Sequence, residues 1–196
     1  MHEVTTHKAL TADLATHLGL QRFSIQRRDQ RINSPRASKI RSRRIIGFGV
    51  KRADIDDVAV CRMFNHAIAG QPLPTHISTD HDPLFRFHRW LANLRVLEID
   101  EIKTVPQVPV SHPFVERLIG TIRRELLDRM LFWNALDLER KLQEFRGYYN
   151  GSRVHQSLSG STPAEQAGKS RPTCAALDLF GWREHCRGLF HTPIAV

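Results

Sequence analysis

Two acidic residues, Asp80 and Glu116, are the clearest candidates for chemistry in this sequence. Asp80 comes just after the apolar approach PLPTHIS, and Glu116 lies one position off an apolar stripe in HPFVERLIGTIRRE, with 35 residues between the two acids. Helical spacing places Gly120 and Arg123 on roughly the same face as Glu116. Gly120 would leave room beside the carboxylate, and Arg123 would supply positive charge. Together these residues suggest a site for a metal ion and a phosphate.

The chemistry that suits such a site is phosphodiester displacement. Mg²⁺ prefers oxygen ligands and is usually held by a few carboxylates together with water and substrate phosphate. Two such ions roughly 4 Å apart activate the attacking oxygen and stabilise the leaving one. Carboxylates from separate elements must then converge on one place. We therefore expect Asp80 and Glu116 to bind Mg²⁺ or Mn²⁺.

Other roles for these residue types stay open. An acid just after a strand often forms an Asx-turn or caps the next helix, and Asp82 is better explained as a cap than as a further ligand. Structural zinc is not favoured, because Cys61, Cys174 and Cys186 form no CxxC pair. Three cysteines without a disulfide framework fit a reducing compartment.

The apolar patterns alternate between two kinds of element. Short apolar runs predict strands over residues 43–50, 72–78 and 95–99. Helical spacing predicts helices over 58–70, 83–94, from about 113 to 130, and 134–149, and a proline-interrupted loop over 104–113 separates the last strand from the third helix. Strands that alternate with helices predict an α/β domain with a partly parallel sheet.

Positive charge is concentrated near the N-terminus. The formal net charge is +9, yet residues 21–52 contain eleven lysines and arginines against Asp29 alone, a net of +10, so the rest sums to about −1. Such a block is either a solvated segment or a phosphate-binding arm, and nucleic acid is the commonest polyanionic partner. No run approaches the roughly 18 apolar residues of a membrane span, and no secretory signal is visible. We expect a cytoplasmic protein.

Three separated blocks give the sequence a family resemblance. STDHDPLFRFHRW, then HPFVERLIGTIRRELLD, then EFRGYYNGSRVHQSLSGSTPAE resemble, in this order, the catalytic core of insertion-sequence transposases and retroviral-type integrases. The resemblance implies a ribonuclease H-like fold, here an incomplete mixed sheet flanked by helices. It also implies that Asp80 is the second catalytic aspartate and Glu116 the catalytic glutamate. The predicted divisions are a basic segment (1–42), the partial core (43–168) and a tail (169–196), the last matching no recognisable pattern.

The family's first catalytic aspartate has no evident counterpart. It should lie on a first strand upstream of residues 43–50, but residues 28–42 have almost no β-branched apolar run, and Asp29 is flanked by arginines. The chain is therefore expected to be a core that lacks its first two strands. A third carboxylate would have to come from Asp29, Asp82 or a partner chain, so the implied activity is expected to be impaired.

The remaining basic residues have two readings each. The resemblance implies that Arg123 and Arg124 contact DNA phosphates, whereas the alternative is exposed charge that pairs with nearby acids. Arg153 and His155 either contact DNA or hold the turn in which they lie. The implied function is metal-dependent DNA cleavage and strand transfer by a DDE-type transposase, with DNA and a second copy or an intact transposase as partners. The alternative is a non-enzymatic DNA-binding or transposase-regulating remnant.

Overall fold

The computed structural model describes residues 24–26, 43–50, 56–79, 82–103, 113–169 and 178–196, with the backbone alone for 24–26, 78 and 113–116. The chain forms two compact units: unit 1 comprises Met1–Arg31 and Ile46–Glu139, and unit 2 comprises Ile32–Ile45 and Arg140–Val196. No helix in the described ranges is both long and apolar enough to cross a membrane. The predicted divisions at residues 42 and 168 remain a prediction.

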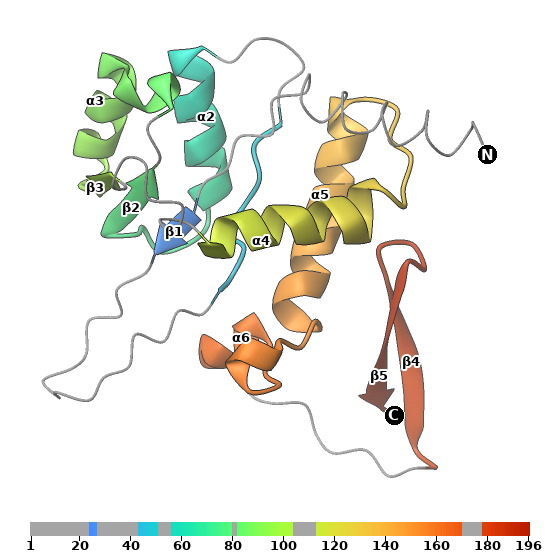
Figure 1. Cartoon of the computed structure of the whole chain (residues 1–196). Coiled ribbons are helices and arrows are strands. Elements are labelled where there is room, and N and C mark those ends of the chain that lie inside the picture. Colours follow the sequence, from blue (N-terminus) through green and yellow to red (C-terminus); the bar gives the residue numbers. More distant parts are fainter. Residues whose placement is uncertain (1–23, 27–42, 51–55, 80–81, 104–112, 170–177) are drawn as a thin grey trace, which may run out of the picture. The chain divides into compact units, whose positions relative to one another are not determined.

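A three-stranded mixed sheet forms the centre of unit 1 (Figure 1). Strand β2 (His76–Thr79) lies between β1 (Ser24–Gln26) and β3 (Asp100–Lys103). It pairs antiparallel with β1, with Ile77 opposite Ile25, and parallel with β3, with Ile77 opposite Glu101. The mixed sheet agrees with the predicted fold class. Strand β1 was not expected, because a three-residue strand is too short to show a period of two.

Two helices cover this sheet with a single apolar cluster. Helix α2 (Asp57–Ile68) and helix α3 (His88–Val96), which follows the short 3₁₀ helix η1 (Pro83–Arg86), confirm the expected helices. Trp90 is fully buried, and its ring lies 5.2 Å from the rings of both Phe64 and Phe85. The cluster comprises Val60, Phe64, Ile68, Ile77, Phe85, Trp90, Leu94 and Ile99. Its burial is the main stabilising contribution in unit 1.

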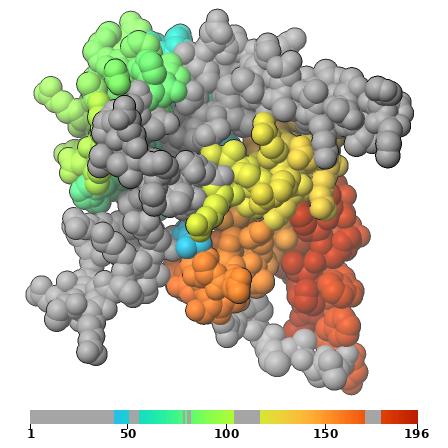
Figure 2. Space-filling model, in the orientation of Figure 1, coloured from blue at the N-terminus to red at the C-terminus, as the bar shows by residue number. Residues whose placement is uncertain are grey.

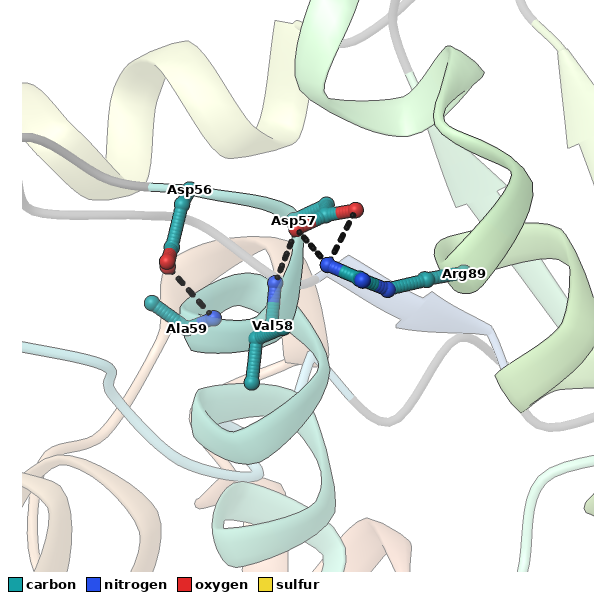
Figure 3. Close-up of polar contacts among 5 residues, drawn as sticks. All are labelled: Asp56, Asp57, Val58, Ala59 and Arg89. Carbon is teal, nitrogen blue, oxygen red and sulfur yellow. Dashed lines mark hydrogen bonds and ion pairs between the residues drawn. The ribbon is translucent and has the colours of Figure 1, made fainter.

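Polar contacts hold the start of α2 against α3 (Figure 3). Asp56 caps the helix, because its Oδ1 accepts a 2.9 Å hydrogen bond from the Ala59 N–H. Asp57 Oδ1 accepts a hydrogen bond from the Val58 N–H. Arg89 Nη1 on α3 donates to the same oxygen at 3.1 Å and forms an ion pair with it. Both carboxylates thus have hydrogen-bond donors, and they lie at a helix N-terminus, where the helix dipole favours negative charge.

Two expected strands are absent from their predicted places. Residues 43–50 do not form a strand; instead, their glycines let the backbone approach α2, and a Cβ built on Gly47 would lie 2.7 Å from the Ala67 Cβ. Gln71 Nε2 donates to the Ile46 carbonyl at 3.1 Å, which holds this segment to the helix. Residues 95–99 instead complete α3 and its terminating turn, so β3 begins at Asp100. Short apolar runs do not distinguish these alternatives.

Helix α4 (Pro113–Ile122) continues into a π-helical turn, η2 (Arg123–Leu127). The wider turn is closed by a 2.8 Å hydrogen bond from the Asp128 N–H to the Arg123 carbonyl. Consecutive leucines, Leu126 and Leu127, are both buried there. The expected helix is confirmed, while its π-helical end was not predicted.

Helix α5 (Ala135–Gly151) supplies the main packing face of unit 2. Asn134 caps it as predicted, with its Oδ1 accepting from the Asp137 N–H at 2.9 Å. The TPAE motif opens the short helix α6 (Pro163–Gln166), where Thr162 and Glu165 exchange the two hydrogen bonds of a capping box. In this chain the motif therefore serves to cap a helix.

The C-terminal residues form a β-hairpin of β4 (Phe180–His185) and β5 (Phe190–Ala195). The hairpin packs on α5, because Phe190 stacks on Tyr148 with ring centroids 4.2 Å apart and Arg187 lies 3.6 Å from Glu144. The sequence pattern predicts no element over these residues, because the pairing of two six-residue strands joined by a tight turn is specified mainly by tertiary packing.

Candidate active site at the end of strand β2

The described elements determine what surrounds the two predicted carboxylates. Strand β2 ends at the buried Thr79, and Asp80, which follows it, lies outside the described residues. Glu116 lies in the first turn of α4, where its backbone is helical but its side chain is outside the described part of the chain. The strand-end and helix settings expected for the two acids thus agree with the flanking elements. Their convergence on one metal remains a prediction.

A hydrogen-bonded network that the sequence did not reveal lies next to the end of β2. The Thr79 hydroxyl donates a 2.6 Å hydrogen bond to Glu101 Oε1 on β3, and Trp90 Nε1 donates to the same oxygen at 3.3 Å. Lys103 Nζ lies 3.9 Å from the other carboxylate oxygen. Parallel pairing of β2 with β3 brings these residues together, and nothing in the local run DEIK indicated a buried acid. The network ties α3 to the two strands just before Asp80.

Neither Glu101 nor Asp82 is placed as a third metal ligand. Side chains alternate along a strand, so Thr79 shares the face of the buried Ile77. Glu101 meets Thr79 on the inner face and is engaged there. Asp82 caps η1, with its Oδ1 accepting from the Leu84 N–H at 2.9 Å. The capping role predicted for Asp82 is therefore confirmed.

The direction of β1 weighs against Asp29 as the missing ligand. Because β1 is antiparallel to β2, Ser24 lies opposite Ser78 and Gln26 lies opposite His76. The chain therefore leaves β1 at the opposite end of β2 from Thr79. Asp29 itself lies outside the described residues, as do Asp13 and most of the basic segment 21–52.

The glycine and arginines of α4 are arranged partly as expected. A Cβ built on Gly120 would meet only the Arg124 guanidinium, 3.6 Å from its Nη1, which is an ordinary contact distance. Arg124, four residues along the helix, therefore lies over Gly120. Both Arg123 and Arg124 are exposed, and the π-helical turn begins only at Arg123, so helical spacing holds between Glu116 and Gly120. Phosphate contact by the two arginines remains a prediction.

Arg153, in unit 2, is packed within its own turn. Its guanidinium lies 5.5 Å from the centre of the Tyr149 ring, and its Nη1 lies 3.2 Å from His155 Nδ1. His155 is buried, and its ring meets Tyr149 edge-on at 4.7 Å. These contacts favour the reading in which Arg153 and His155 hold the turn. The role of Arg153 in nucleic-acid binding remains a prediction.

The donor chemistry of the predicted site fits a hard divalent cation. Asp80 and Glu116 offer only carboxylate oxygens, which Mg²⁺ and Mn²⁺ accept and which do not favour zinc or copper. Among the residues that the structure describes, no group of three or more His, Cys, Asp or Glu side chains could hold a metal ion. The binding of a metal ion by Asp80 and Glu116 remains a prediction.

The mixed sheet, its covering helices and the predicted acids after β2 and in α4 resemble an integrase-type catalytic core. Comparison with known proteins agrees. Residues 97–163 match the family model of the integrase core domain. The chain is 26% identical over 117 residues to the insertion element IS476 uncharacterized 39.2 kDa protein of Xanthomonas euvesicatoria, covering 60% of this chain and 34% of that protein. It thus spans about a third of that relative.

Solved structures were compared as well, and one with a TM-score above 0.5 has a similar fold. A chain of the simian T-cell lymphotropic virus intasome, solved with PP2A regulatory subunit B56 gamma, matches with a TM-score of 0.51 and 20% identity over 75% of this chain and 55% of that one. The HTLV-2 integrase catalytic core domain in complex with magnesium matches with a TM-score of 0.46 and 22% identity over 60% of this chain and 72% of that one. The predicted resemblance to integrase cores and the predicted fold class are confirmed.

Proposed function

We propose that this chain is a transposase- or integrase-type DNA recombination protein that cleaves a DNA end and joins it to target DNA. The observation that carries the proposal is the integrase core match over residues 97–163, which includes Glu116. The spacing of 35 residues between Asp80 and Glu116 supports the same assignment. DNA is the proposed substrate, and a second copy or an intact transposase is the proposed oligomeric partner.

Each proposed role follows from the position of a residue. Asp80 and Glu116 would hold Mg²⁺ or Mn²⁺ through carboxylate oxygens and orient the scissile phosphodiester. When bound, the divalent ions supply activation of the attacking oxygen and charge neutralisation at the leaving oxygen. Water attacks the phosphorus first, and the bond to the 3′ oxygen breaks. The freed 3′ hydroxyl then attacks a phosphorus of the target DNA, and the bond from that phosphorus to the target's own 3′ oxygen breaks. Arg123 and Arg124 would neutralise phosphate charge beside the glutamate.

We infer that this activity is weakened by the lack of a third carboxylate. Asp82 is engaged as a cap, Glu101 is engaged by Thr79 and Trp90, and β1 leads away from the end of β2 where Asp80 follows. Two acids bind a divalent ion less tightly than three. A partner chain would then supply the remaining ligand.

The experiment that tests this function is a cleavage and strand-transfer assay in Mn²⁺. The purified chain is incubated with supercoiled plasmid and end-labelled duplex, beside Glu116→Gln and Asp80→Asn, with Asp82→Asn as the matched control. We expect weak nicking that both site variants abolish and that Asp82→Asn retains. Nicking that survives Glu116→Gln would show that the activity has another source, and a folded chain with no nicking in Mn²⁺ would reject the enzyme.

A second candidate function is DNA binding without catalysis, through which the chain regulates an intact transposase. The excess of positive charge in unit 2 favours it, because phosphate binding needs basic side chains and no metal. Such a protein binds DNA with strong salt dependence and little sequence preference. Adding it to an active transposase would lower strand transfer by forming mixed oligomers, and unchanged strand transfer would exclude this role.

A further inference from the structure

The two units differ in the sign of their charge. In the described part of unit 2, nine lysines and arginines face four acids, whereas the described part of unit 1 has nine lysines and arginines against eleven acids. Three of the four acids of unit 2 have structural partners: Glu144 pairs with Arg187, Glu165 closes the capping box, and Glu184 pairs with His191. The long-range field of unit 2 is therefore positive, which attracts a polyanion.

An asparagine on α5 fixes the segment that carries two of these arginines. Asn150 Oδ1 accepts from the Ile45 N–H at 2.9 Å, and Asn150 Nδ2 donates to the Ile45 carbonyl at 2.8 Å. Ile45 is buried, so its backbone N–H and carbonyl have little access to water. Losing either hydrogen bond to Asn150 would therefore cost stability. The orange atoms of residues 152–169, which follow α5 in the same unit, form part of the surface that Figure 2 shows. Arg43 and Arg44, which directly precede Ile45, are thereby held near α5 within unit 2.

The backbone of this segment is held in an unfavourable conformation. Arg43 has a φ of 53°, in the left-handed region that side chains other than glycine rarely adopt. Its guanidinium also donates to the Ser157 hydroxyl. A left-handed arginine costs free energy, and such strain persists mainly where the surrounding structure or a function requires it.

The clamp brings a like charge close to Arg146. Arg146 lies one helical turn before Asn150 on α5, so the two side chains occupy the same face. Partial burial lowers the pKa of the Arg146 guanidinium from its ordinary value, and the positive charge of Arg44 lowers that pKa further. The positive charge of Arg44 thus disfavours the charged form of Arg146, and a phosphate that contacts both side chains would offset this effect.

We propose that Arg44 and Arg146 form a phosphate-binding pair that grips the backbone of duplex DNA, with Asn150 as the positioning residue that holds Arg44 in place. The guanidinium forks suit phosphate oxygens. Arg44 belongs to the basic block of residues 21–52, whereas Arg146 was not among the predicted DNA contacts. The choice of DNA as the phosphate carrier rests on the proposed function. The site lies within unit 2 and needs neither Asp80 nor Glu116, so it binds in the absence of metal.

The test measures DNA affinity as a function of salt in EDTA, using the full chain and a short fluorescein-labelled duplex. Arg44→Gln and Arg146→Gln should each weaken binding several-fold at low salt and reduce the slope of log affinity against log salt by about 1, and the double variant by about 2. Arg95→Gln, an exposed arginine in the last turn of α3 in unit 1, is the matched control and should leave the slope unchanged.

A further variant separates positioning from charge. Asn150→Ala keeps both arginines but removes the clamp, so affinity should fall although the charge of the chain is unchanged; thermal melts of every variant check that the fold is retained. Inorganic phosphate should compete only in the millimolar range or above, as expected for a site that gains affinity from several linked phosphates.

The outcomes distinguish this inference from the proposed function. The inference would be overturned if both arginine variants kept the wild-type slope of log affinity against log salt, or if the wild-type chain did not bind DNA. Metal-dependent nicking together with unchanged slopes would reject the pair and retain the enzyme. Reduced slopes in a chain that never nicks DNA would retain the pair and reject the enzyme.

Discussion

The Thr79 hydroxyl on β2 donates a 2.6 Å hydrogen bond to Glu101 on the neighbouring strand β3. Both side chains are largely buried, and Trp90 of α3 donates to the same carboxylate oxygen. This contact holds the last residue of β2 just before Asp80. The end of the strand is therefore fixed from one side by side chains distant in sequence.

Removing the acceptor should destabilise unit 1. We expect Glu101→Ala to cost about 1–3 kcal/mol of unfolding free energy, because the buried Thr79 hydroxyl and Trp90 N–H lose their acceptor. Glu101→Gln keeps an acceptor oxygen and should cost less. Urea denaturation followed by Trp fluorescence gives both values, and equal costs for the two variants would contradict a role for the hydrogen bonds.

The close approach of residue 47 to α2 predicts a strong effect of one methyl group. A Cβ on Gly47 would lie 2.7 Å from the Ala67 Cβ and 2.9 Å from the Ala67 carbonyl oxygen, so Gly47→Ala should destabilise by about 1–3 kcal/mol through overpacking. Gly147, exposed in α5 with nothing within 4 Å of a built Cβ, is the matched control.

The control should change stability in the opposite direction. Gly147→Ala is expected to stabilise by about 0.5–1 kcal/mol, because alanine loses less backbone entropy in a helix. Circular dichroism in urea measures both. A Gly47→Ala variant as stable as the wild type would show that the segment and the helix are less closely packed than the structure has them.

The end of α3 predicts a stabilising substitution. Glu98 has a φ of 54°, and the Ile99 N–H donates to the Leu94 carbonyl at 3.0 Å while the Glu98 N–H donates to the Arg95 carbonyl at 3.2 Å. This is a Schellman motif with glutamate where glycine is favoured. Glu98→Gly should raise stability by about 1 kcal/mol by relieving the left-handed strain, and Glu98→Ala should not. A gain in both variants would point to lost charge instead.

The hairpin turn predicts a pH dependence. Burial, and secondarily the negative charge of Glu144, raise the pKa of the Cys186 thiol to about 11. A raised folded-state pKa means that the neutral thiol contributes stability at neutral pH. That contribution falls once the pH exceeds the ordinary thiol value, because the unfolded chain then releases the proton more readily.

The measurement compares the urea midpoints of the wild type and Cys186→Ala. The difference between the two midpoints should be constant below about pH 8.5, the ordinary thiol pKa. As the pH rises toward about 11, the wild-type midpoint should fall relative to that of Cys186→Ala. Alkylation gives a second readout: Cys186 in the folded chain should react slowly near neutral pH, where the reactive thiolate is scarce. Rapid labelling of Cys186 there would contradict the raised pKa.

Local spacing in the sequence was enough to predict the helices and the resemblance to integrase cores. Helices α2, α4 and α5 carry apolar stripes at the helical period, and the caps at Asp82 and Asn134 could be predicted because a cap involves only residues two to three positions apart. The order of the three family blocks similarly depends on sequence alone. These features are local, so chain context hardly alters them.

Only the tertiary structure decided how separate segments meet. The bond from Thr79 to Glu101, the clamp of Ile45 by Asn150 and the stacking of Phe190 on Tyr148 each join residues far apart in the chain or on different elements. Short strands such as β1 and β3 exist because a neighbour pairs with them, and their few residues carry no readable period. Burial and pairing energies come from these distant contacts, which is why local patterns cannot predict them.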